Sequence, residues 1–113
     1  MSIIMRTLLS FEENADQLKD VADRWVAATR AEEGVLGFHA FIDLEGGQLI
    51  FLEHYRDSEA FMTHRELVSP DLRTELYSVA RFESWEIYGN PSEELMSVAA
   101  AGGGRIFNHV ASR

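Results

Sequence analysis

A glycine pair, Gly46-Gly47, lies between two apolar segments and constrains this chain more than any other feature. Consecutive glycines supply the positive φ angles of a tight turn, so residues 35–44 and 48–55 are predicted to pair as a hairpin. Helical patterns precede and follow the hairpin, so residues 29–68 join the end of one helix to two strands and the start of a second helix. This stretch sets the middle of a mixed α+β fold.

The first helix is predicted from apolar residues that recur at helical spacing on one face: Leu18, Val21, Ala22, Trp25, Val26 and Thr29. Either Asn14 or Asp16 is suited to cap its start, and Gly34 is suited to end it in a left-handed conformation. The second helix is predicted to begin with Ser58 as its N-cap. Its apolar stripe comprises Phe61, His64, Leu67 and Val68, and Pro70 breaks it.

The strands complete a β-α-β-β-α-β order. Residues 2–10 are β-branched and apolar and predict the first strand, residues 71–80 repeat a helical pattern, and residues 81–88 predict the fourth strand. Right-handed crossovers turn this order into a ferredoxin-like antiparallel sheet with helices on one face. The strands are rich in aromatic residues, so a bare second face is not expected, and we expect a second copy to cover it in a sheet-to-sheet homodimer.

The third strand alternates two sets of side chains. One face carries Leu49, Phe51, Glu53 and Tyr55, and the other carries Ile50, Leu52, His54 and Arg56. We expect His54 to be an interface or surface residue. Glu53 is expected to face the barrel interior and to pair with an arginine across the dimer.

The C-terminal segment is distinct from the domain at residues 1–90. Residues 91–113 predict a short helix, a flexible joint at residues 102–104 and an extra strand within residues 105–111. A strand on such a joint is suited to pair with an exposed edge of its own sheet or of a partner's. The extension is therefore expected to be packed on the domain or swapped in the dimer.

Charge and composition exclude several function classes. The formal net charge is -9 and the chain has no cysteine, so nucleic-acid binding, thiolate metal sites and cysteine nucleophiles are not expected. The four histidines show no metal-ligand spacing. No apolar run approaches the about 20 residues that span a bilayer. We expect a cytoplasmic protein without a metal and without a membrane partner.

Two motifs resemble those of the antibiotic biosynthesis monooxygenase family. They are T-R-A-E-E-G-V-L-G-F at residues 29–38 and F-L-E-H-Y-R-D-S-E-A-F-M-T-H at residues 51–64. The resemblance covers residues 2–88, and the segment after Gly89 is similar to an extension that some members carry. It implies a dimeric α+β barrel with a hydrophobic pocket between each sheet and its helices. The best-known members oxidise aromatic phenols, anthrones or quinols with molecular oxygen and no cofactor.

The resemblance also suggests site residues. His64 corresponds to the family's helix-two histidine, which implies a role as base or hydrogen-bond donor. Tyr55 corresponds to the family's aromatic residue at the end of strand three, which implies that it orients a phenolate or stacks on a ring. The aromatic residues suggested as the lining of the pocket are Phe38, Phe41, Phe51, Phe61, Trp25 and Trp85. The alternative for each of these residues is packing in the core.

The sequence leaves other functions open. One alternative is a non-catalytic module that binds a small ligand or only assembles, because few polar residues converge on the expected pocket. Another is a relative of the haem-degrading branch of this fold. That branch uses an asparagine in the first strand, and residues 2–10 contain none, while Leu76-Tyr77 stands where its histidine is expected.

Overall fold

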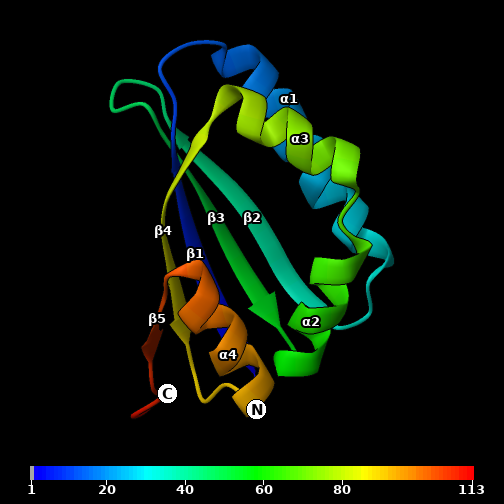
Figure 1. The fold of residues 1–113 in the computed structure, drawn as a ribbon, viewed down its shortest axis with the longest axis vertical. Helices are drawn as coiled ribbons and strands as arrows, with labels where there is room; N and C mark the ends of the chain where they lie inside the picture. The colour runs from blue at the N-terminus through cyan, green and yellow to red at the C-terminus, as the bar shows by residue number, and fades with distance from the viewer. Residues whose placement is uncertain (1) are drawn as a thin grey trace.

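The structure of the chain is a computed structural model that describes residues 2–113 (Figure 1). The expected domain at residues 1–90 therefore begins one residue outside the described part. The elements follow the order β1 (Ile3–Ser10), α1 (Ala15–Ala28), a 3-10 turn (Thr29–Ala31), β2 (Val35–Asp43), β3 (Gln48–Tyr55), α2 (Ser58–Leu67), α3 (Pro70–Val79), β4 (Arg81–Tyr88), α4 (Glu93–Gly102) and β5 (Gly104–Phe107). The predicted order of the first four strands and their helices is confirmed.

The five strands form one sheet in the order β2-β3-β1-β4-β5. The first four pair with one another in antiparallel fashion, and β1 lies between β3 and β4, which is the ferredoxin-like arrangement. The hairpin register pairs Phe38 with Glu53 and Asp43 with Gln48. Only the second glycine of the hairpin pair, Gly47, has a positive φ.

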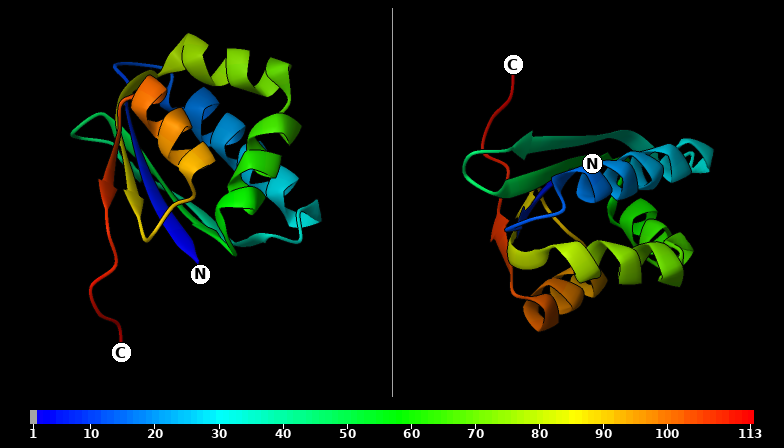
Figure 2. Two further views of the ribbon diagram at one scale, coloured as in Figure 1. Left: turned by 60° about the horizontal axis from the view of Figure 1, so that its bottom comes forward. Right: turned by 90° about the horizontal axis from the view of Figure 1, so that it is seen from above.

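All four helices lie on one face of the sheet (Figure 2). The residues of β1 and β3 that point toward the helices form the centre of the core: Ile3, Met5, Leu9, Leu49, Phe51 and Tyr55. No helix of the described residues covers the opposite face. Ile4 at 42% and Phe41 at 55% are among its exposed apolar side chains.

Several details of the helix ends differ from the sequence expectation. Gly34 does not have a positive φ, because the 3-10 turn ends the helical region before it. A Cβ on Gly34 would lie 2.5 Å from the Cβ of Ala60, so the glycine allows α2 to pack closely on the loop before β2. Asp57, not Ser58, caps α2, and its side chain accepts a hydrogen bond from the Ala60 amide at 2.8 Å.

In the second helix, one residue of the predicted apolar stripe is not buried. Phe61 and His64 are buried, but Leu67 is 61% exposed. The break at Pro70 is as predicted: α2 ends at Leu67, and the proline occupies the first turn of α3. Asn14 is the N-cap of α1, in a left-handed conformation and without a side-chain capping bond.

The C-terminal extension forms a helix and a strand, as predicted, but the strand is Gly104–Phe107, and residues 108–111 are not part of it. Gly103 ends α4 in a left-handed conformation, and β5 then runs parallel to β4 of the same chain. Phe107 accepts a hydrogen bond at its carbonyl from the Gly89 amide at 2.9 Å. In this arrangement the extra strand extends its own sheet. None of the helices in residues 2–113 is long and apolar enough to cross a membrane.

Candidate functional site

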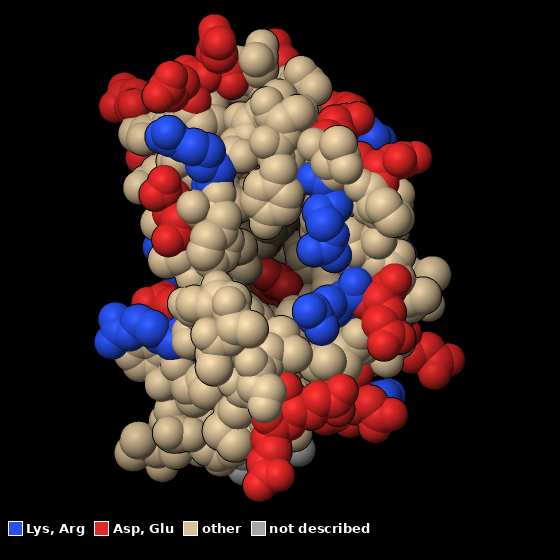
Figure 3. Space-filling view, in the orientation of Figure 1, with Lys and Arg blue, Asp and Glu red and all other residues tan. Residues whose placement is uncertain are grey.

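A cavity of about 610 Å³ lies between the sheet and the helices α2, α3 and α4. Figure 3 shows it as a hollow on the helical face, with an acidic group at its floor and basic groups along one rim. Its size falls in the range of small-molecule sites. The C-terminal extension contributes one wall, through Ser97, Val98, Ala101 and Gly102.

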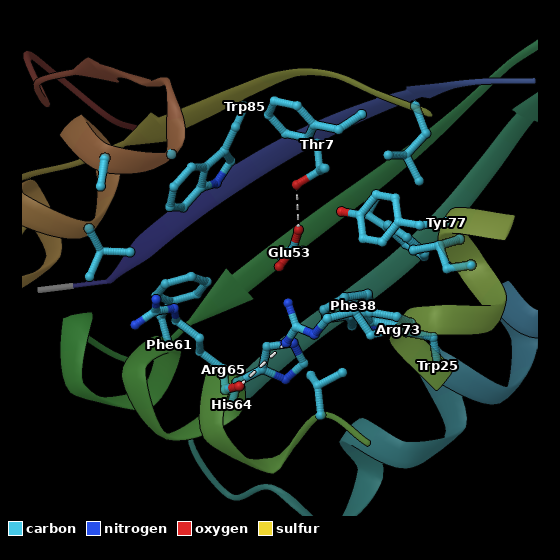
Figure 4. Close-up of a pocket in the computed structure, with 18 of the residues that line it drawn as sticks. Thr7, Trp25, Phe38, Glu53, Phe61, His64, Arg65, Arg73, Tyr77 and Trp85 are labelled. Carbon is cyan, nitrogen blue, oxygen red and sulfur yellow. Dashed lines mark hydrogen bonds between the residues drawn. The ribbon is translucent and has the colours of Figure 1, made fainter. Parts of the chain in front are cut away.

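Glu53 is the acidic residue at the floor of the cavity. It projects from β3 toward the centre of the site, and the hydroxyl of Thr7 on β1 donates a hydrogen bond to its Oε2 at 3.0 Å (Figure 4). The hydroxyl of Tyr55 donates to its Oε1 at 2.5 Å. Burial raises the pKa of Glu53 to about 6, although both hydrogen bonds favour the carboxylate and act in the opposite direction. The carboxyl is therefore ionised at neutral pH and more basic than an exposed glutamate.

This position differs from the role expected from the sequence. Glu53 points toward the helices and into the cavity, not toward the open sheet face, and its partners are hydroxyl groups of the same chain. An ion pair with an arginine of a second copy across the open face does not fit this orientation.

Tyr55 lies behind Glu53 and does not line the cavity. It is fully buried, and its ring contacts Phe61 at 5.4 Å and His64 at 5.6 Å between ring centroids. Burial and the neighbouring Glu53 carboxylate raise the pKa of the phenol above its usual value, so Tyr55 remains a neutral donor. Its hydrogen bond fixes one oxygen of Glu53.

His64 on α2 does line the cavity and has a carboxylate partner outside it. Its Nδ1 lies 3.0 and 3.3 Å from the two carboxylate oxygens of Glu32. Burial lowers the pKa of His64, Glu32 opposes this, and the nearby charge of Arg73 adds to it. The imidazole is thus neutral at pH 7. Since a carboxylate can only accept, Nδ1 carries the hydrogen and Nε2 is an acceptor.

Glu32 was not identified from the sequence as a site residue. It lies in the loop after the 3-10 turn, where its amide donates to the Thr29 carbonyl at 2.9 Å and its carbonyl accepts from the Val35 amide at 3.1 Å. The hydrophobic periodicity that predicts helices and strands gives no information on a residue in such a loop. Its pairing with His64 depends on how closely α2 packs on the loop.

Five of the six aromatic residues suggested for the pocket line the cavity: Trp25, Phe38, Phe51, Phe61 and Trp85. Trp25 and Phe51 stack at 5.8 Å, and Phe61 and Trp85 approach to 5.7 Å. Phe41 does not line it. Its cross-strand partner is Ile50, and it stacks on His39 away from the cavity.

The remaining histidines stand apart from this site. His54 projects from the face of β3 opposite to Tyr55, as expected, and His109 in the C-terminal segment bonds the hydroxyl of Ser112 at 2.7 Å. Within residues 2–113 there is no group of three or more histidine, aspartate or glutamate side chains arranged to hold a metal ion.

The match to a protein-family model assigns the chain to a family. Residues 1–69 match the model described as "Antibiotic biosynthesis monooxygenase". The chain belongs to this family. The matched part includes β1 to α2, and with them Glu32, Glu53, Tyr55 and His64. No curated protein matches the chain significantly.

Solved structures share the fold of this antibiotic biosynthesis monooxygenase family member at low identity. MupZ from Pseudomonas fluorescens is 20% identical over 99% of this chain and 94% of its own, with a TM-score of 0.86. Rv0793 from Mycobacterium tuberculosis is 20% identical over 82% of this chain and 98% of its own, with a TM-score of 0.68. SnoaB from Streptomyces nogalater, described as a cofactor-independent oxygenase, is 13% identical over 80% of this chain and 94% of its own, with a TM-score of 0.67.

The MupZ match extends over the C-terminal helix and strand, whereas the other two cover about four fifths of the chain. The extension that closes one side of the cavity is thus part of a fold seen in another protein. At these identities the likeness concerns the fold alone.

Proposed function

We propose that this protein is a cofactor-independent oxygenase that oxidises a small aromatic phenol, anthrone or quinol with molecular oxygen. The observation that carries the proposal is Glu53, an ionised carboxylate of raised pKa at the floor of an aromatic cavity. Membership of the monooxygenase family supports it, and so does the fold shared with the oxygenase SnoaB.

In this proposal Glu53 is the base. It takes the acidic proton of the bound substrate, and the resulting carbanion or phenolate is electron-rich enough to reduce oxygen directly. For an anthrone, the CH₂ group and O₂ yield a carbonyl group and water through a hydroperoxide, so the substrate supplies all the electrons. The aromatic walls hold the planar ring system and exclude water from the anion.

His64 and Tyr55 have supporting roles in the same scheme. His64 presents Nε2 as an acceptor for a substrate hydroxyl, because Glu32 holds the hydrogen at Nδ1. Tyr55 is a positioning residue: it holds one oxygen of Glu53 at 2.5 Å, and the other oxygen is held by Thr7. The free lone pairs of the carboxylate are thereby directed to one place in the cavity.

Oxygen consumption with an anthrone and a quinol panel tests the proposal. The unmodified protein and Glu53→Gln are both treated with a chelator, and their turnover numbers are compared. Glu53→Gln retains the shape of the side chain but removes the base. We expect the turnover number to fall about 100-fold or more in Glu53→Gln. His64→Gln is expected to raise KM and lower the turnover number less. Glu45→Gln in the exposed hairpin turn is the matched control and should keep full turnover.

No oxygen consumption above background with any panel member, or full turnover in Glu53→Gln, would contradict the proposed chemistry. Saturable ligand binding without oxygen consumption would instead favour the alternative of a small-ligand-binding module.

We also propose that two copies associate through the open sheet face. This face carries exposed apolar side chains on a central strand and at both edges, Ile4, Phe41 and Phe107. Within residues 2–113, Nε2 of His54 on the same face is buried and has no hydrogen-bond partner. Exposed apolar patches mark protein interfaces, and a buried polar atom without a partner in its own chain is explained if a second copy supplies one.

A further inference from the structure

Two arginines that line the cavity have no carboxylate partner in the described part of the chain. They are Arg65 on α2 and Arg73 on α3. Four other arginines of this acidic protein form ion pairs: Arg6 with Glu86, Arg24 with Asp20 and Glu75, Arg56 with Asp57, and Arg81 with Glu12. Within residues 2–113, Arg30, Arg105 and Arg113 form none, but they do not line the cavity. The rim of the cavity therefore keeps two positive charges available.

The positions of both arginines agree with a binding role. Figure 3 shows basic side chains along one rim of the hollow, and Figure 4 shows Arg65 and Arg73 on the His64 side of Glu53. The Arg73 guanidinium also donates a hydrogen bond to the Arg65 carbonyl at 3.5 Å, which ties α3 to α2 at this place. The positive charge of Arg73 acts on groups inside the site. It adds to burial in lowering the pKa of His64, and at Tyr77 it opposes burial, which raises the pKa of that phenol.

We infer that the substrate carries a carboxylate group, which binds at the rim between Arg65 and Arg73 while its apolar ring system occupies the aromatic cavity. Guanidinium groups match the geometry of a carboxylate, and a protein of net charge -9 repels anions elsewhere. Among residues 2–113, Glu53 is the one acidic side chain that lines the cavity. It would repel a carboxylate at the floor, so an acidic ligand has one favoured orientation, with its anionic group outward and its ring near the base.

The inference deepens the proposed function and rests on it for the cavity as the substrate site. A binding measurement tests it without the oxidation. Anthracene-9-carboxylate and the neutral anthracene-9-methanol have the same ring system, so fluorescence titration compares them directly. We expect the carboxylate to bind at least tenfold more tightly to the unmodified protein, and its affinity to fall with rising salt concentration.

The arginine variants then locate the group. Arg65→Gln and Arg73→Gln should each weaken carboxylate binding about tenfold and leave the affinity of the alcohol unchanged. Both side chains are exposed, so the fold is retained, and circular dichroism checks this. Arg30→Gln, an exposed arginine that does not line the cavity, is the control and should change neither affinity.

Equal affinities for the two ligands, or unchanged carboxylate affinity in both arginine variants, would overturn the inference and leave the proposed oxygenase standing. Preferred carboxylate binding without any oxygen consumption would support the inference and contradict the oxygenase. If neither ligand binds, the inference is contradicted, and oxygen consumption with the anthrone and quinol panel decides the proposed oxygenase separately.

Discussion

At the scale of the residue, Glu53, the base of the proposed reaction, lowers the stability of the fold. The folded chain holds a proton on this carboxyl up to a pKa of about 6, whereas the ordinary value is 4.5. Between these pH values the folded state binds more protons than the unfolded state, so stability falls as pH rises. The predicted loss is about 2 kcal/mol, complete above pH 6.

Glu53→Gln tests this, since the amide does not titrate. We expect the stability of the unmodified protein, relative to Glu53→Gln, to decline by about 2 kcal/mol between pH 4 and pH 7.5. Urea unfolding at several pH values measures it. The Glu45→Gln variant should show no such relative change, and a flat or rising difference for Glu53→Gln would refute the raised pKa.

The sequence shows in part how this residue comes to be where it is. Alternation along residues 48–55 puts Glu53 on the same face as Phe51 and Tyr55, and the structure has that face toward the helices. Alternation along the strand does not predict which side chains of the helices lie over this face. The approach of Glu32 to His64, and the positions of Arg65 and Arg73, depend on tertiary packing of α2 and α3 and have no local signal.

At the scale of the element, the contact between the loop before β2 and α2 organises the Glu32–His64 pair. Gly34 and Ala60 meet there, and the Gly34 carbonyl accepts a hydrogen bond from the Arg56 amide at 2.8 Å. The sequence pattern predicted a left-handed helix stop at this glycine. The structure requires a glycine there for another reason, a close approach of two elements that are distant in sequence.

Gly34→Ala should therefore destabilise the fold. The new Cβ would lie 2.5 Å from that of Ala60, so the helix or the loop must shift, at a cost of about 1–3 kcal/mol. Urea unfolding measures the change. Gly37→Ala is the matched control, because its nearest neighbour would be the His39 side chain at an ordinary 3.5 Å. Similar stabilities of the two variants would count against a tight contact at Gly34.

At the scale of the whole molecule, the two faces of the sheet differ: helices cover one face, and the other is open. Its helical face encloses the cavity, and the extension at α4 and β5 adds both a wall and a fifth strand. The element order and the helix layer followed from hydrophobic periodicity and the glycine turn. The choice of edge for β5 did not, because a strand of four residues pairs equally well with any free edge until α4 is placed.

The open face should then decide the oligomeric state. Ile4 lies on a central strand of the sheet, is 42% exposed and faces away from the helices, so an acidic side chain there would be buried uncompensated in a sheet-to-sheet dimer. We expect the unmodified protein to sediment as a dimer and Ile4→Glu as a monomer with the same circular dichroism. Leu67→Glu makes the same change on α2, at a site that is 61% exposed, and should remain dimeric. A dimer that survives Ile4→Glu, or a monomeric unmodified protein, would show that this face is not the interface, and the exposed apolar side chains would then require another partner.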